Sequence, residues 1–133
     1  TGALLITNDG ELTHRLLHPK KHITKEYKAV VKGILKRSDI LKLRNGIMLN
    51  DGITLPAKVY VNSRKDDITK LKLEISEGRN RQIRRMFSAL NAKVIKLHRS
   101  KFAGISIGQL KPGQWRSLTI KELDYLHKIT KDS

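Results

Sequence analysis

The chain has 133 residues, of which 28 are lysine or arginine and 12 are aspartate or glutamate, so its formal net charge at pH 7 is +16. This length suits one domain with its own core, and the lack of cysteine excludes disulfides and cysteine-based zinc sites and fits a reducing cytoplasm. No stretch is long and apolar enough for a membrane span or a signal peptide, so the charge indicates a polyanion partner, with nucleic acid favoured over an anionic membrane surface.

The amino-terminal part of the chain predicts a short strand followed by a helix. Residues 3–6 are all apolar, which is typical of a strand covered on both faces. Asn8 with Glu11 three residues later has the form of a capping box, and leucines then recur at helical spacing. Because Pro19 cannot continue a helix, we expect about two to three turns that end before it.

The next segment predicts a longer strand and a second helix. Residues 26–34 predict a strand with Tyr27, Ala29, Val31 and Gly33 on one side and Lys28, Val30, Lys32 and Ile34 on the other, so Tyr27 lies on a face of small side chains. Ser38 is a suitable N-cap for a helix that ends at Asn45 and Gly46. A turn is expected at residues 50–52, where Asn, Asp and Gly follow one another.

The second half of the chain predicts a hairpin, a further strand and a final helix. Residues 57–61 and 71–75 alternate with a period of two, and the polar residues 62–67 should form an exposed connection between them. Residues 93–102 should form another strand, Trp115 should cover the edge of the core, and Thr119 with Glu122 should cap the last helix. Strands and helices interleave without regular alternation. We therefore expect an α+β fold, with a mixed, mostly antiparallel sheet and helices packed on it, in a single domain over residues 1–133.

Residues 77–87 place four arginines at a turn and at the start of a helix. Asn80 is a suitable N-cap, and the apolar residues after it recur on one face of the helix. Guanidinium groups and the free N–H groups of a helix start both bind phosphate or carboxylate oxygens. The alternative is a solvated arginine face that only keeps the protein soluble. The expected apolar face contains Ile83, Met86, Phe87 and Leu90, and the expected basic face contains Arg81, Arg84 and Arg85.

Three stretches resemble motifs of the bacterial ribosomal RNA pseudouridine synthases of the RsuA/RluB type. Residues 78–86 resemble the arginine motif of that family, residues 1–10 resemble the end of its nucleophile motif, and residues 25–33 resemble its tyrosine motif. The motifs also follow one another in the family's order, and the resemblance reaches from Thr1 to about the final helix. It implies a pseudouridine synthase-like fold with a large mixed sheet and a central cleft.

The resemblance also implies that part of the catalytic domain lies outside this chain. The family's nucleophilic aspartate stands in a Gly-Arg-Leu-Asp segment a few residues before the Thr-Gly with which this chain begins, and its amino-terminal RNA-binding domain lies further upstream. We therefore expect residues 1–133 to be the carboxy-terminal part of the catalytic domain, inactive without its parent protein. The missing initial methionine agrees with a fragment or a processed product. Asp9 belongs to the family's turn and is not expected to replace the nucleophile.

The same resemblance implies roles for individual residues. Arg84 aligns with the arginine that pairs with the catalytic aspartate, and a nearby guanidinium favours the charged carboxylate, although a phosphate contact is the alternative. Tyr27 aligns with the tyrosine that stacks on the target base, whereas the strand pattern alone would suggest an ordinary core tyrosine. RNA contacts are expected from Lys25, Arg79, Arg81, Gln82, Arg85, Lys96, His98, Arg99 and Lys101.

The implied activity is isomerisation of one uridine to pseudouridine in ribosomal RNA, by a cytoplasmic monomer that needs no metal or other cofactor. The alternative is a non-catalytic RNA-binding or ribosome-associated module, which would not require Tyr27 and Arg84 to share a pocket. His14, His18 and His22 recur every four residues, but Pro19 interrupts the helix that a metal site on one face would need. Residues 43–57 resemble the large-subunit members of the family more than the small-subunit enzyme. The sequence does not identify the target uridine.

Overall fold

The computed structural model describes residues 2–18, 22–106 and 110–130. Four α-helices and seven strands occur in this part of the chain. They are, in order, α1 (Gly10–Leu17), β1 (Lys25–Lys32), α2 (Arg37–Asn45), β2 (Met48–Leu49), β3 (Gly52–Ile53), β4 (Lys58–Lys65), β5 (Ile68–Ile75), α3 (Gln82–Ser88), β6 (Lys93–Phe102), β7 (Ile105–Ser106) and α4 (Ile120–Thr130).

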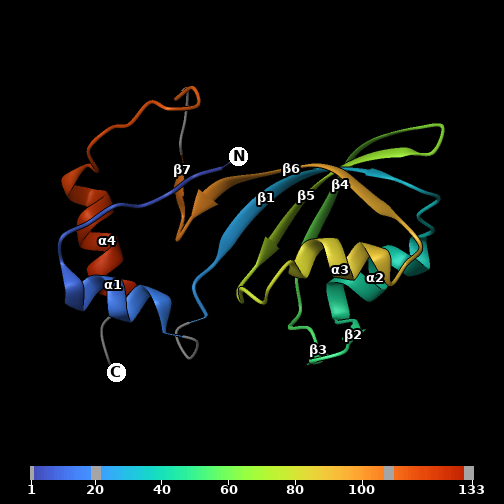
Figure 1. Cartoon of the computed structure of the whole chain (residues 1–133), viewed down its shortest axis with the longest axis horizontal. Coiled ribbons are helices and arrows are strands. Elements are labelled where there is room, and N and C mark those ends of the chain that lie inside the picture. Colours follow the sequence, from blue (N-terminus) through green and yellow to red (C-terminus); the bar gives the residue numbers. More distant parts are fainter. Residues whose placement is uncertain (1, 19–21, 107–109, 131–133) are drawn as a thin grey trace.

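A curved five-stranded sheet in the order β4-β5-β1-β6-β7 is the centre of the fold. All its strand pairs are antiparallel, and an isolated parallel bridge between Gly2 and Arg99 places the start of the chain beside β6. In Figure 1, α2, α3 and the small β2–β3 hairpin lie below one end of the sheet, and α1 and α4 lie at the other end near β7. The expected α+β architecture with a mostly antiparallel sheet is therefore confirmed.

The two faces of the sheet differ in what covers them. Tyr27, Ala29 and Val31 alternate along β1 with Lys28, Val30 and Lys32, as period two requires. We call the face that carries the first three the helix-covered face, because Ala29 and Val31 are buried in a core shared with α2 and α3. We call the face that carries the other three the open face. A second core lies between α1, α4 and β7 and includes Leu12, Leu16, Ile105 and Leu126.

The strands agree closely with their sequence patterns. The strand expected at residues 93–102 is β6 with the same bounds, and the expected hairpin is formed by β4 and β5. The strands of this hairpin are longer than the alternation suggested, because pairing continues to Lys65 and Ile68 and leaves only Asp66 and Asp67 in the turn. The sequence pattern did not predict this longer pairing, because the register shift between Val61 and Ser63 is a bulge that interrupts the period of two.

Two apolar segments that the sequence patterns predicted to be buried are largely exposed. Residues 3–6 form no strand, and Leu4 and Ile6 are 73% and 88% exposed while Ala3 is buried. Trp115 is 82% exposed and does not cover the core. Apolar character alone predicted burial at these positions, but burial requires a neighbouring element to pack on the side chain, and the described residues supply none.

The starts of α1 and α2 are shifted from the expected caps. The cap of α1 is Asp9 rather than Asn8, because the Asp9 carboxylate accepts the Leu12 N–H at 3.0 Å. The cap of α2 is Lys36 rather than Ser38, and its N–H donates to the Asp39 carboxylate at 2.8 Å. Neighbouring polar residues compete for these positions, so the sequence identifies the helix start only to within a residue or two.

The capping box of α4 is confirmed. Thr119 accepts the Glu122 N–H at 3.1 Å, and Glu122 accepts the Thr119 N–H at 2.9 Å. Arg116 also donates two hydrogen bonds to the Glu122 carboxylate, at 2.7 and 2.8 Å. These contacts, with that of Arg116 the largest, lower the pKa of Glu122 to about 2. The capped start of α4 therefore keeps its charge well below neutral pH.

Candidate active site and nucleic-acid interface

The arginine segment turns from β5 into the short helix α3. Ile83, Met86 and Phe87 are buried in the core, as the apolar spacing predicted. The N-cap is Arg81 rather than Asn80, and Arg81 adopts a left-handed conformation with φ of 51°. A non-glycine residue in this conformation is strained, and such strain is concentrated at functional sites. The helix start is therefore held in place by its surroundings rather than by a capping side chain.

Arg79 attaches this loop to the β2–β3 hairpin. Its guanidinium donates to the carbonyl oxygens of Gly52 at 2.8 Å and Ile53 at 2.5 Å. It also contacts the carboxylates of Glu77 at 3.3 Å and Asp51 at 3.2 Å. These contacts use most of its donors, which leaves little capacity for a phosphate. The predicted RNA contact of Arg79 thus competes with an intramolecular role.

Arg85 is bound to the same hairpin. Its two terminal nitrogens donate to both oxygens of Asp51, at 3.1 and 3.0 Å, and its Nε donates to the Asn80 carbonyl at 2.9 Å. The hydrogen bonds from Arg85 are the main cause that lowers the pKa of Asp51, with a smaller contribution from Arg79. We call Asp51, Arg79 and Arg85 the hairpin latch, because together they join the hairpin tip to α3.

Replacing Asp51 by asparagine should loosen the hairpin without unfolding the sheet. The neutral amide keeps the shape of the side chain but loses the two-pronged ionic contact with Arg85. We expect faster hydrogen exchange at hairpin amides that are internally bonded, such as Thr54, and unchanged exchange in β1. Asp67→Asn, in the β4–β5 turn, removes the same charge and is the control. Equal exchange in both variants would contradict the latch.

The latch should also depend on pH. Because the pKa of Asp51 is lowered in the folded state, the latch contributes stability above the usual aspartate pKa of 3.8. This contribution is lost as the pH falls through the lowered value. Hydrogen exchange at the hairpin amides of the unmodified protein should therefore approach that of Asp51→Asn at acid pH.

Gln82 is a structural residue of the loop rather than an exposed contact. It is 4% exposed, and its side-chain amide donates to Glu77 at 2.8 Å and accepts the Arg79 N–H at 3.2 Å. The same Glu77 oxygen accepts the Leu55 N–H at 2.9 Å. A side chain so enclosed cannot reach an RNA strand, so the predicted RNA contact of Gln82 is not supported. Sequence reasoning missed Glu77, which connects three segments through one carboxylate.

Arg84 and Arg81 retain donors that the rest of the loop does not use. Arg84 is half-buried and donates to the Val94 carbonyl on β6 at 3.3 Å. No described carboxylate lies within ion-pair distance of it, in contrast to Arg79 and Arg85. The Arg81 side chain is exposed and has no hydrogen-bond or ion-pair partner among the described residues. These two arginines can therefore accept an external anion without breaking an internal ion pair.

Tyr27, Lys25 and Arg99 converge on the helix-covered face. Tyr27 lies opposite Leu73 on β5 and Arg99 on β6, so the side chains of Tyr27, Leu73 and Arg99 share that face. Arg99 donates to the Ala3 carbonyl at 2.8 and 2.5 Å, which fixes its guanidinium beside the start of the chain. Burial, followed by the charge of Arg99, lowers the pKa of Lys25, while Glu77 acts in the opposite sense.

Lys96, His98 and Lys101 lie on the other side of the sheet. They pair with Val30, Lys28 and Glu26, respectively, which belong to the open face. The sequence predicted that these three residues contact RNA together with Arg99, and the register places them on the face of the sheet opposite Arg99. Two register shifts in the β1–β6 pair caused the difference, because each shift changes which residues of β6 share a face.

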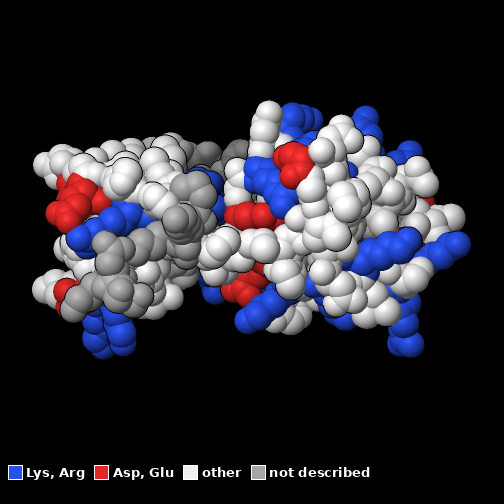
Figure 2. Space-filling model, turned by 90° about the horizontal axis from the view of Figure 1, so that it is seen from below, with Lys and Arg blue, Asp and Glu red and all other residues white. Residues whose placement is uncertain are grey.

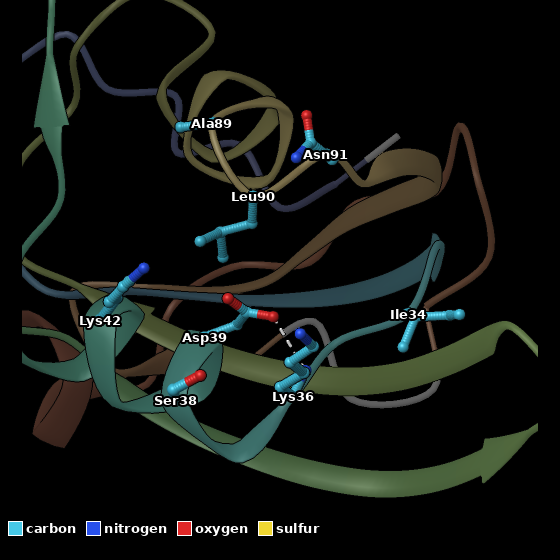
Figure 3. Close-up of a pocket in the computed structure, with 8 residues that line it drawn as sticks. All are labelled: Ile34, Lys36, Ser38, Asp39, Lys42, Ala89, Leu90 and Asn91. Carbon is cyan, nitrogen blue, oxygen red and sulfur yellow. Dashed lines mark hydrogen bonds between the residues drawn. The ribbon is translucent and has the colours of Figure 1, made fainter.

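Figure 2 views the molecule from the side of α2, α3 and the hairpin. Acidic side chains adjoin basic ones on this side, as the latch requires, so the surface is not uniformly positive. A cavity of about 520 Å³ lies between the start of α2 and the turn after α3 (Figure 3). It is lined by Lys36, Asp39, Lys42 and Leu90 among others, and neither Tyr27 nor Arg84 lines it.

The described residues show no metal centre and no membrane span. No three histidine, aspartate or glutamate side chains among them are close enough together to hold a metal ion. His14 and His18 have ring centroids 5.9 Å apart, but α1 ends between them at Leu17, and Pro19 lies outside the described residues. None of the described helices combines the length and the apolar character needed to cross a bilayer.

The fold and this site place the chain in a known class. A model of the family described as RNA pseudouridylate synthase matches residues 1–89, and the chain belongs to this family. A crystal structure of a pseudouridylate synthase has a TM-score of 0.83 and 36% identity, covering 94% of this chain and 54% of that one. The expected pseudouridine synthase-like fold is thereby confirmed.

Curated relatives are bacterial members of the same class. Ribosomal large subunit pseudouridine synthase B of Bacillus subtilis is 44% identical over 131 residues, covering 97% of this chain and 54% of that protein. Ribosomal large subunit pseudouridine synthase E of Vibrio parahaemolyticus is 38% identical over 133 residues, covering 90% and 56%. Both agree with the RsuA/RluB type that the motifs suggested. The chain spans about half the length of the curated relatives it matches.

Proposed function

We propose that the protein containing this chain isomerises a uridine in ribosomal RNA to pseudouridine. In this reaction the bond from the ribose to the base nitrogen breaks, the uracil turns, and a new bond forms to a ring carbon. That carbon loses a proton and the freed nitrogen gains one, so the reaction is balanced without a cofactor. Family membership and the relatives' ribosomal names support the substrate class.

The position of Arg84 is the observation that carries this proposal. A half-buried guanidinium without a carboxylate is costly, and a carboxylate placed beside it would be held ionised and oriented. We propose that the nucleophilic aspartate precedes Thr1 and pairs with Arg84. Gly2 bridges Arg99 in the parallel sense. A chain continuing backward from Gly2 in that direction would pass along β6 toward Val94, where Arg84 donates.

We propose that Tyr27 holds the target base on the same side of the sheet. Val31 lies opposite Val94, and four residues separate Val31 from Tyr27 on β1, which is about 13 Å. We propose that the target nucleotide lies between the Tyr27 ring and the Arg84 guanidinium. Stacking would offset part of the few kcal/mol that flipping a base out of its helix costs. We propose that Lys25, Arg81 and Arg99 contact the adjacent phosphates.

The proposed parent protein has further expected properties. Residues 1–133 would be the carboxy-terminal part of its catalytic domain, with an RNA-binding domain upstream. It would act on ribosomal RNA in the cytoplasm as a monomer, and the charge of +16 supports the polyanion partner. A module that only binds RNA is the second candidate, because it needs the same charge.

An assay of full-length protein on unmodified ribosomal RNA tests the activity. We expect one pseudouridine, detected by carbodiimide mapping, and its loss when the aspartate aligned before Thr1 is replaced by asparagine. RNA binding by that variant would show that it is folded. Binding without any pseudouridine formation by the unmodified protein would favour the second candidate.

A further inference from the structure

The open face of the sheet carries rows of lysines that no proposed step of the reaction uses. Residues paired across antiparallel strands point to the same face, so the register gives the rows directly. Lys28 on β1 lies opposite Lys72 on β5, and Lys32 lies opposite Lys93 on β6. The rows across β6, β1, β5 and β4 are His98, Lys28, Lys72 and Tyr60, then Lys96, Val30, Lys70 and Ser63, and then Lys93, Lys32, Ile68 and Lys65.

Few carboxylates balance these lysines. Glu26 and Glu74 lie at one end of the open face, and each already has a lysine partner, at 3.8 Å from Lys101 and 3.7 Å from Lys58. None of the lysines in the three rows forms an ion pair with a described carboxylate. All are exposed except the half-buried Lys72, whose ammonium lies over the Tyr60 ring. The row lysines that no described carboxylate pairs with are Lys28, Lys32, Lys65, Lys70, Lys72, Lys93 and Lys96.

This arrangement is unfavourable for the isolated protein. Like charges directly opposite each other on neighbouring strands destabilise a sheet, and this applies to Lys28 with Lys72 and to Lys32 with Lys93. Solubility does not require paired positions of this kind, since lysines can be placed on helices and loops at lower cost. A bound polyanion would offset the repulsion between these lysines, because each lysine would be attracted to the negative charges of the polyanion.

We propose that the open face binds the phosphate backbone of an RNA segment other than the one proposed to contact Tyr27 and Arg84. This inference rests on the proposed function for the identity of the polyanion. Tyr27 lies on the helix-covered face, opposite the open face, and in Figure 1 α2 and α3 lie together on one side of the sheet. The protein would therefore contact its ribosomal substrate on both faces of the sheet.

The dimensions of the open face fit a double-helical segment. Four strands span about 14 Å and three rows span about 13 Å along the strands. A nucleic-acid duplex carries one charge per about 1.7 Å of axis, so about eight phosphates fall within that length. Lysine is a flexible point charge without the planar fork of arginine, which suits backbone contact without sequence readout. Lysines spread over four strands of a sheet also differ from the amphipathic helix by which proteins bind anionic membranes.

A set of lysine substitutions in the full-length protein tests the proposal. The open-face variant carries Lys28→Gln, Lys70→Gln, Lys72→Gln and Lys96→Gln. The control variant carries Lys42→Gln, Lys111→Gln, Lys121→Gln and Lys128→Gln, which remove the same charge from exposed positions outside the sheet. The probe is a fluorescein-labelled double-helical RNA hairpin, and its dissociation constant is measured by anisotropy over a series of salt concentrations.

We expect the open-face variant to bind at least about tenfold more weakly at about 0.1 M salt, with a salt slope reduced by about two to four. The control variant should keep the slope of the unmodified protein. The open-face variant should also unfold at an equal or higher temperature, because its cross-strand repulsion is removed. Equal salt slopes in the two variants would overturn the proposal.

Two further measurements distinguish RNA binding by the open face from membrane binding and from a failure of the proposed activity. Vesicles of phosphatidylserine and phosphatidylcholine replace the RNA in a sedimentation assay. If the open-face variant loses vesicle binding but keeps the salt slope of RNA binding, the open face binds membranes instead. Pseudouridine formation is measured in parallel. If the unmodified protein forms none, the proposed function fails, whereas modification combined with equal slopes rejects only the open-face proposal.

Discussion

Replacing Arg84 by lysine in the full-length protein should reduce pseudouridine formation by about 100-fold or more, the scale of loss when one preorganised electrostatic contact is removed. Lysine keeps the positive charge but loses the planar fork that fixes the direction of a carboxylate. Because the Arg84 side chain is half-buried and bound to the Val94 carbonyl, a shorter, rounder ammonium cannot reproduce both contacts. RNA affinity should stay within about threefold, since the net charge is the same.

Single-turnover modification of ribosomal RNA, followed by carbodiimide mapping, measures this loss. Arg64→Lys, at an exposed position of β4, makes the same chemical change away from Arg84 and Tyr27 and should leave the rate unchanged. Anisotropy with the same RNA reports binding for both variants. A normal modification rate in Arg84→Lys would show that Arg84 is not a catalytic residue. Arg84 would then have the alternative role, a contact with an RNA phosphate.

Replacing Tyr27 by leucine should weaken use of the target nucleotide by about 5- to 150-fold in kcat/KM, which corresponds to the about 1–3 kcal/mol of one base stacked on an aromatic ring. Tyr27→Phe should retain most activity, because the ring face rather than the hydroxyl makes the proposed contact. The two variants together separate stacking from hydrogen bonding. Tyr125→Leu, at a half-exposed position of α4, is the matched control.

Thermal unfolding must accompany the Tyr27 measurement, because the ring packs partly against the main core. A Tyr27→Leu variant that is equally active and less stable would show that the residue is an ordinary core tyrosine. A variant that is less active at temperatures far below its unfolding transition supports the stacking role. If Tyr27→Phe lost as much activity as Tyr27→Leu, the proposed stacking contact would be wrong.

Periodicity made the strands and the core of α3 predictable. The bounds of β6 agree with the pattern, and the alternation of β1 identified the face on which Tyr27 lies. Ile83, Met86 and Phe87 are buried as their spacing required. These features depend on the local geometry of helix and strand, which repeats at 3.6 and 2 residues whatever surrounds the element. Local rules are therefore sufficient for them.

The candidate site was less predictable, because its decisive contacts join distant segments. Arg79 and Arg85 were expected to face RNA, and both are instead bound to Asp51, 28 and 34 residues away. The turn at Asn50-Asp51-Gly52 was recognisable, but its closeness to α3 depends on how the hairpin packs. In a chain with 28 basic residues Asp51 has many possible basic partners, and the sequence does not identify which of them it contacts.

The sequence by itself determined the family, the order of the helices and the longer strands, and the basic character of the protein, because motifs, periodicity and composition are properties of the chain alone. The tertiary structure decided which basic side chains remain available to a ligand. It bound Arg79 and Arg85 into the latch, left Arg81 and Arg84 with open donors, and moved Lys96 and His98 to the open face. Hairpin packing decided the partners of Arg79 and Arg85, and strand register decided the face on which Lys96 and His98 lie. A shift of one residue in the register would move the side chains of a strand to the opposite face.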